Sequence, residues 1–180
     1  MWVIATSPGV EAGYVEGQAI SYSGQGFSLR GEKGRFVLPP QFRKSVRESS
    51  DGNRTLCLAK HERWNCLTGF GLSRKNAFTA QIDREELLAI QRGHEFDRDL
   101  RQIQLFGFTE VPFDDSGRFV LPDHLLDLGR VEDGLFFQGA GDFFVLWNPQ
   151  EIDTMGTGWE GAKAACAMLA AEAANGKVRK

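Results

Sequence analysis

The hexapeptide GRFVLP occurs at Gly34–Pro39 and again, unchanged, at Gly117–Pro122. In both copies a polar turn, EKG or DSG, leads into the apolar run Phe-Val-Leu, and a proline ends that run. The glycines Gly34 and Gly117 can take the positive φ that a tight hairpin turn requires. Proline ends a strand because it cannot donate a hydrogen bond to the ladder. The hexapeptide therefore predicts two equivalent strand–turn–strand units.

Each copy continues with the same succession of elements. The helix after the first copy would begin at Pro40 and bury Phe42. The helix after the second copy would bury Leu125 and Leu128 on one face. Both copies then run into apolar hairpins, at residues 55–70 and 134–147. The repeating unit is thus predicted to be strand, strand, helix, strand, strand.

The repeat divides the chain into five segments. The stretch between the copies reads as two helices, and the alanine-rich tail reads as one helix with Gly176 as its stop signal. We expect a flexible N-terminal extension at 1–20, a first repeat at 21–74, connecting helices at 75–103, a second repeat at 104–150, and a C-terminal Ala-rich helix with a basic tail at 151–180.

The composition favours a folded, non-catalytic protein. Hydrophobic residues make up 42% of the chain, enough for a packed core. No phosphate-binding loop, nucleophile elbow or helical zinc motif occurs, so we expect no catalytic residues, no cofactor and no small-molecule substrate. Cys57, Cys66 and Cys166 lack ligand spacing with the histidines, which predicts buried, reduced thiols and no metal site. Without a signal peptide or a long apolar run, we expect a cytoplasmic protein with no membrane partner.

Positive charge is concentrated around the first copy. The chain has a net charge of −3, but residues 30–47 contain six basic residues against one acidic residue, Glu32. The six are Arg30, Lys33, Arg35, Arg43, Lys44 and Arg47. Such a run is either a phosphate-binding footprint or a solvated face. Residues 110–133, around the second copy, hold seven acidic and only two basic residues. Arg35 and Arg118 are the turn arginines that both copies share.

The two copies closely resemble the repeats of the MraZ family of bacterial transcriptional regulators, which consist of two SpoVT/AbrB-type domains. The stretches concerned are GEKGRFVLPPQFR, FDDSGRFVLPDHL and GAGDFFVLW, and the resemblance covers residues 21–150. It implies a β-rich α+β fold of two swapped-hairpin, double-split β-barrel repeats related by pseudo-twofold symmetry. It also implies a ring-like homo-oligomer of several subunits that binds double-stranded DNA and is associated with the nucleoid. The expected target is the promoter of the division and cell-wall gene cluster, with its short G-rich direct repeats.

Family members bind DNA through a DxxxR motif at each hairpin, and this motif defines the candidate site. The second copy matches it with Asp114 and Arg118, whereas the first copy has Arg35 but carries Gly31 where the aspartate is expected. We predict that Arg35 and Arg118 read bases. The structural alternative for Arg118 is an ion pair with Asp114 that only stabilises the turn.

Further roles follow for the residues around the first turn. Lys33 occupies the basic position that precedes the turn glycine in the family, and we predict that Lys33, supported by Arg30, contacts phosphates. Gly34, Gly117 and Asp114 are expected to shape the turns. The rival function is an AbrB-like protein-interaction module of the antitoxin type. Such modules usually have one copy of the unit and a disordered tail, so two copies in one chain disfavour it.

Overall fold

The computed structural model describes residues 20–178, so the predicted flexible extension at 1–20 lies outside the described residues except for Ile20. The strands are β1 (Gln25–Leu29), β2 (Arg35–Val37), β3 (Thr55–Lys60), β4 (Leu67–Phe70), β5 (Thr109–Pro112), β6 (Arg118–Val120), β7 (Gly134–Gly139) and β8 (Phe144–Trp147). The helices are α1 (Pro40–Ser49), α2 (Phe78–Gln91), α3 (Arg98–Phe106), α4 (Asp123–Leu128), α5 (Pro149–Asp153) and α6 (Glu160–Val178). Short 3₁₀ segments lie at Glu32–Gly34 and Leu72–Ala77.

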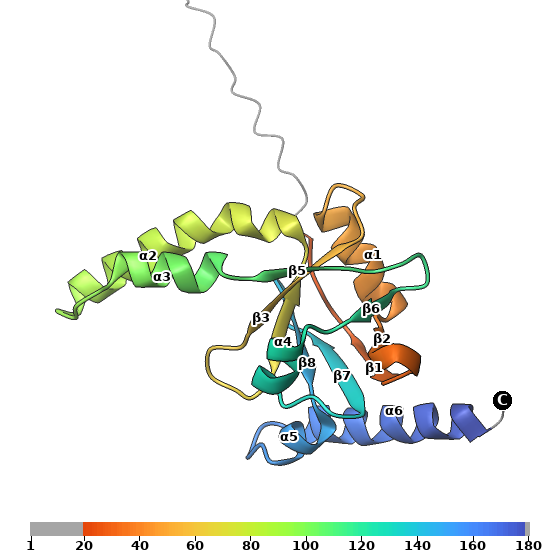
Figure 1. Ribbon diagram of the computed structural model, residues 1–180. Coiled ribbons are helices and arrows are strands. Elements are labelled where there is room, and N and C mark those ends of the chain that lie inside the picture. Colours follow the sequence, from red (N-terminus) through yellow and green to blue (C-terminus); the bar gives the residue numbers. More distant parts are fainter. Residues whose placement is uncertain (1–19, 179–180) are drawn as a thin grey trace, which may run out of the picture.

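These elements form a mixed α+β fold around one antiparallel sheet of six strands (Figure 1). The strand order is β1-β7-β8-β4-β3-β5, and every pairing is antiparallel. β1 therefore pairs with β7, and β5 pairs with β3, so each half of the chain adds its first strand to the hairpin of the other half. The sheet confirms the predicted β-rich α+β class.

The two FVL runs form a sheet of their own. β2 and β6 pair antiparallel, with Phe36 opposite Phe119 at the centre of the pair. Both phenylalanines are buried, and their ring centroids lie 6.2 Å apart. Because successive side chains of a strand face opposite ways, the residues on either side of each phenylalanine point outward. The GRFVLP copies thus meet across a short ribbon whose inner face belongs to the core.

The helices that follow the two copies differ in how well they match the prediction. α1 begins at Pro40 and buries Phe42, as expected. α4 buries Leu125, but the prediction for Leu128 is wrong, because this side chain is 47% exposed. α4 has only six residues and ends at Leu128, and Leu126 is the second leucine that packs against the core.

The segment between the copies forms an antiparallel pair of helices, α2 and α3, that projects from the body (Figure 1). Ion pairs join the two helices. Arg98 binds Asp83 at 2.7 Å and Glu86 at 2.5 Å, and Arg101 binds Glu85 at 2.5 Å. Apolar side chains on this helical pair remain exposed, namely Leu87, Leu88, Ile90, Leu100, Ile103 and Phe106.

The alanine-rich helix α6 lies along the body, beside β1 and β7 (Figure 1). Cys166 is buried on its inner face, next to a cluster that contains Trp147. The predicted stop at Gly176 is wrong, since the helix continues to Val178. One glycine costs a helix only about 1 kcal/mol relative to alanine, and the alanines before it favour continuation. Among the helices that the structure describes, none combines the length and the hydropathy needed to cross a membrane.

Candidate nucleic-acid interface

Asp114 organises the second turn. Its Oδ1 accepts hydrogen bonds from the backbone N–H groups of Ser116 at 3.0 Å and Arg118 at 2.9 Å, and its Oδ2 accepts one from Nε of Arg118 at 2.6 Å. The backbone N–H of Arg118 is the main cause that lowers the pKa of the Asp114 carboxyl below its ordinary value of 3.8. Gly117 completes the turn with a φ of 82°. Arg118 is therefore oriented by a carboxylate, while half of its side chain stays exposed.

The first turn reaches the same closure without a carboxylate. The backbone N–H of Gly31 donates to the carbonyl of Arg35 at 2.7 Å, just as Asp114 donates to Arg118 at 3.0 Å. Both Lys33 and Gly34 have positive φ, 57° and 70°. Within residues 20–178, no carboxylate lies within ion-pair distance of Arg35, so its side chain is not oriented as Arg118 is.

Arg30 lies across the first turn. A Cβ placed on Gly34 would be 3.4 Å from Nη2 of Arg30, which means that the guanidinium group passes close over the turn glycine. Lys33 stands at the exposed tip of the same turn. Both basic residues predicted to contact phosphates are thus found together at the turn that precedes β2.

The β2–β6 ribbon brings the two turn arginines onto one surface. Arg35 pairs with Val120, and Val37 pairs with Arg118, so all four residues share the outer face of the ribbon. The two valines are 40% and 51% exposed. Residues diagonal to one another on such a pair lie about 7–8 Å apart, within reach of long side chains. Two arginines that are far apart in the sequence therefore flank a small apolar surface that faces solvent.

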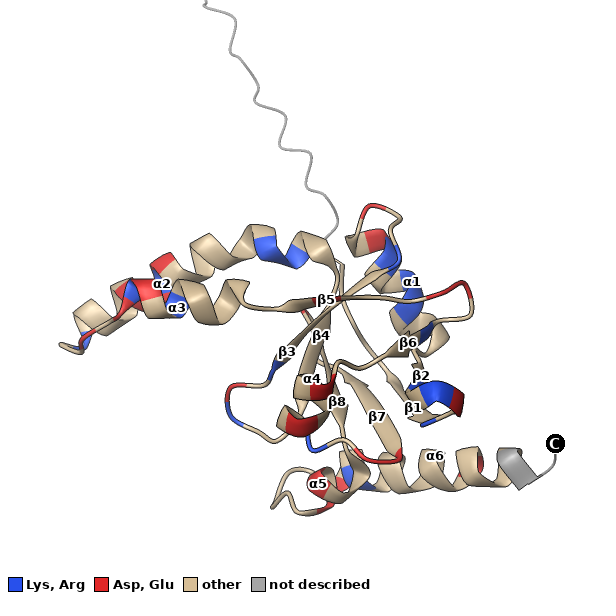
Figure 2. Cartoon of the chain, viewed as in Figure 1, with Lys and Arg blue, Asp and Glu red and all other residues tan. Residues whose placement is uncertain are grey.

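The sequence analysis included the basic residues of α1 in a possible phosphate-binding footprint but did not assign any of them to the predicted site. Nη1 of Arg43 donates to the backbone carbonyl of Asp115 at 3.1 Å, and Arg54 forms an ion pair with the Asp115 carboxylate. Basic residues accordingly cover α1 and the turn before β2, whereas α4 carries acidic residues (Figure 2). The available signal was the spacing of Arg43 and Arg47, which puts both on one side of a helix.

The charged side chains described above are suited to binding a partner through ion pairs and hydrogen bonds. The adjacent carboxylates of Asp114 and Asp115 do not converge, because each is engaged by a different arginine. The three thiols are free and buried, as predicted, and burial raises the pKa of Cys57 and Cys66 to about 12 and that of Cys166 to about 11. No group of His, Cys, Asp or Glu that could hold a metal ion is found between Ile20 and Val178.

Comparison with known proteins identifies relatives that match about two thirds or more of the chain. No family model matches the chain. The chain is 32% identical over 132 residues to the transcriptional regulator MraZ of Parvibaculum lavamentivorans, which covers 72% of this chain and 76% of the relative. It is 33% identical over 129 residues to MraZ of Ruegeria pomeroyi, covering 67% and 73%, and 28% identical over 124 residues to MraZ of Maridesulfovibrio salexigens, covering 68% and 77%. The chain belongs to the MraZ family of transcriptional regulators.

Proposed function

We propose that this protein is a sequence-specific regulator that binds double-stranded DNA with the outer face of the β2–β6 ribbon. The observation that carries the proposal is the diagonal placement of Arg35 and Arg118 on that exposed face. The major groove of B-DNA is wide enough to admit a two-stranded β-ribbon. The names of the relatives, all transcriptional regulators, support the same function.

In the proposed complex the two arginines read guanines. An arginine can donate two hydrogen bonds to O6 and N7 of guanine, which is the commonest specific contact in the major groove. This preference suits short G-rich direct repeats, and we propose the promoter of the division and cell-wall gene cluster as the target. Lys33 and Arg30, at the turn before β2, would hold phosphates and set the register. No cofactor or small-molecule substrate enters this mechanism.

We further propose that the chain consists of two SpoVT/AbrB-like repeats, at 21–74 and 104–150, that form swapped-hairpin barrels related by pseudo-twofold symmetry. The strand order supports this. Exchanging β1 with β5, β3 with β7 and β4 with β8 turns the order β1-β7-β8-β4-β3-β5 into its own reverse. The ribbon agrees, because β2 pairs with its counterpart β6 and the two equivalent phenylalanines face each other.

We infer a ring-like homo-oligomer, with the exposed apolar side chains of α2 and α3 in the contact between subunits. Ile103 is 70% exposed and Leu100 is 50% exposed, on a helical pair that projects from the body. Several protomers that bind successive repeats would gain affinity through effective concentration. We place such an assembly in the cytoplasm, on the nucleoid.

The proposed function is tested by fluorescence anisotropy on a duplex from upstream of the protein's own gene, with a scrambled duplex of equal length as the control. We expect Arg35→Ala and Arg118→Ala each to lose about 1–3 kcal/mol of binding and most of the preference for the upstream duplex. If only Arg35→Ala loses binding, the second copy has a structural role and does not contact DNA. A wild-type protein that binds neither duplex at low salt would contradict the function itself.

A further inference from the structure

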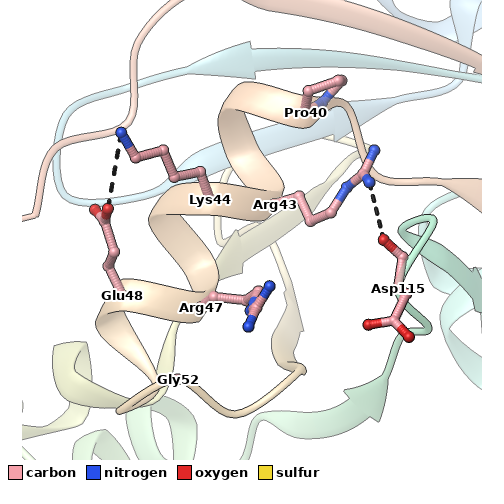
Figure 3. A pocket seen from close by; sticks show the side chains of 7 residues that line it. All are labelled: Pro40, Arg43, Lys44, Arg47, Glu48, Gly52 and Asp115. Atoms are coloured by element: carbon pink, nitrogen blue, oxygen red, sulfur yellow. Dashed lines mark hydrogen bonds and ion pairs between the residues drawn. The ribbon is translucent and has the colours of Figure 1, made fainter.

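A hollow of about 530 Å³ lies beside α1, where this helix passes the loop between β5 and β6 (Figure 3). Three basic side chains of α1 line it, together with two acidic residues: Arg43, Lys44, Arg47, Glu48 and Asp115. Arg43 and Arg47 are one helical turn apart and therefore lie on the same side of α1. In the close view Arg43 reaches across the hollow toward the loop that carries Asp115.

The positive charge of this pocket is only weakly neutralised. Arg47 forms no ion pair or side-chain hydrogen bond with any residue from 20 to 178, and its side chain is exposed. Lys44 is 4.0 Å from Glu48, and both side chains are mostly in solvent, where such a pair contributes little. The carboxylate of Asp115 is already bound by Arg54. The basic side chains of the pocket are thus not balanced by acidic side chains.

Arg43 also has hydrogen-bonding capacity left. Its Nη1 binds a backbone carbonyl, which leaves its positive charge uncompensated, and its Nη2 forms no hydrogen bond with any residue from 20 to 178. Its Nε is buried against Gly117 and is not available to a ligand in the pocket. Phosphate oxygens are strong acceptors for guanidinium groups. The pocket therefore has the chemistry of a phosphate site.

Arg43 ties this pocket to the turn of Arg118. A Cβ placed on Gly117 would come within 2.7 Å of Nε of Arg43, so the absence of a side chain at Gly117 lets the arginine pass. The residue after Gly117 is Arg118, one of the two proposed base readers. A phosphate in the pocket would accordingly be bound next to the turn that presents a base-reading arginine.

The second copy has no such site. Aligning the two copies on GRFVLP puts Leu126 and Asp127 of α4 where α1 has Arg43 and Lys44. Arg130 stands where α1 has Arg47, but it forms an ion pair with Glu151 at 3.1 Å. The surroundings of α4 are acidic (Figure 2).

We propose that the α1 pocket holds a backbone phosphate of duplex DNA, and that each protomer therefore docks on DNA in a single direction, with its first half against the phosphates. This inference rests on the proposed DNA-binding function. It assigns sequence-independent affinity to α1 and leaves base discrimination to the ribbon.

The test is anisotropy with the full chain, on the upstream and the scrambled duplex, between about 50 and 200 mM salt. Losing one phosphate contact makes the negative slope of log K against log salt less steep by about 0.9. We expect Arg47→Ala to show this decrease on both duplexes, with an equal loss of affinity on each. Arg47→Lys keeps the charge and should keep the slope. Arg63 lies in the β3–β4 loop, on the opposite side of the body from α1 (Figure 1). Arg63→Ala removes the same charge and should change neither the salt slope nor the affinity.

A second measurement locates the phosphate. Single neutral methylphosphonate linkages are scanned along the upstream duplex, and one position should weaken the wild type yet leave Arg47→Ala unaffected. An unchanged slope for Arg47→Ala, or a loss confined to the upstream duplex, would overturn the phosphate site while leaving DNA binding intact. A wild-type protein that binds neither duplex would overturn both the site and the proposed function.

Discussion

The two turns are closed by the same backbone hydrogen bond but are stabilised by different residues. Asp114 accepts hydrogen bonds from two backbone N–H groups and from the guanidinium of Arg118, so the turn and the arginine are held together. In the first copy Gly31 offers no acceptor, and the turn instead places Lys33 and Gly34 in the left-handed region. Arg35 is consequently free to sample rotamers, and ordering it on DNA costs entropy.

A carboxylate at position 31, equivalent to Asp114 of the second copy, should remove the entropic cost of ordering Arg35. A Cβ on Gly31 would be 3.5 Å from its nearest neighbour, the carbonyl oxygen of Arg35, so a side chain fits. We expect Gly31→Asp to bind the upstream duplex about two- to tenfold more tightly than Gly31→Ala, because immobilising a long side chain costs about 0.5–1.5 kcal/mol. Anisotropy measures the difference.

The same pair of variants carries a pH signature. A carboxyl whose pKa is lowered in the folded state stabilises the fold above its ordinary pKa and loses that contribution as the pH falls. The urea midpoint of Gly31→Asp should exceed that of Gly31→Ala at pH 7, and the gap should close as the pH falls below about 3.9, the ordinary aspartate value. A gap that persists at low pH would show that the carboxylate is not bound as Asp114 is.

At the scale of elements, the ribbon has one structural and one functional face. Phe36 and Phe119 belong to the core, while the arginines and valines between and beside them face solvent. Three residues per strand cannot form a stable ribbon alone, since isolated two-stranded pairs are marginal in water. The buried phenylalanines are what hold the two turns at a constant separation.

Shortening a side chain on the inner face should therefore lower the stability of the fold, rather than change DNA recognition directly. We expect Phe119→Ala to lower the free energy of unfolding by about 3–5 kcal/mol, as for other large aromatic side chains in cores. Val120→Ala, one residue away on the outer face, should cost less than about 1 kcal/mol. Urea denaturation of the two variants decides this, and similar losses at both positions would mean that the ribbon is not attached to the core through Phe119.

At the scale of the whole molecule, the projecting α2–α3 pair is the largest departure from a closed globule. Phe78 and Ile82 of α2 are buried, and ion pairs such as that of Arg101 with Glu85 join the two helices, but the outward apolar side chains of the pair stay exposed in a single chain. Exposed apolar patches of this kind mark interaction surfaces. A ring of identical subunits would bury them.

This contact can be broken by a single charge. We expect Ile103→Asp to reduce the mass in solution to that of a smaller species, and to weaken binding to the multi-repeat upstream duplex more than binding to a single repeat. Light scattering coupled to size-exclusion chromatography gives the mass. Leu128→Asp, which puts the same charge at an exposed leucine of α4, is the control and should leave the mass unchanged. A wild-type monomer would contradict the ring.

Much of this protein could be predicted from its repeat. The two GRFVLP units predict the turns at Gly34 and Gly117 and the short strands, and the residues that follow predict the helix that begins at Pro40 and the apolar hairpins, because these depend on backbone preferences of neighbouring residues. The pairing of Asp114 with Arg118 could also be predicted, since they are only four positions apart in one turn. The apolar periodicity was misleading at Leu128, the last residue of a six-residue helix, and the stop signal was misleading at Gly176, which the alanine-rich helix passes.

The tertiary structure alone decided which distant residues meet. The pairing of Arg35 with Val120 and of Val37 with Arg118 puts two arginines on one face, and no local pattern contains that register. The contact of Arg43 with the carbonyl of Asp115 likewise joins the first helix to the second turn. Contacts between residues this far apart form because they bury a shared core, as Phe36 and Phe119 do here. The sequence by itself thus determined the two copies, and long-range packing determined how they combine into one surface.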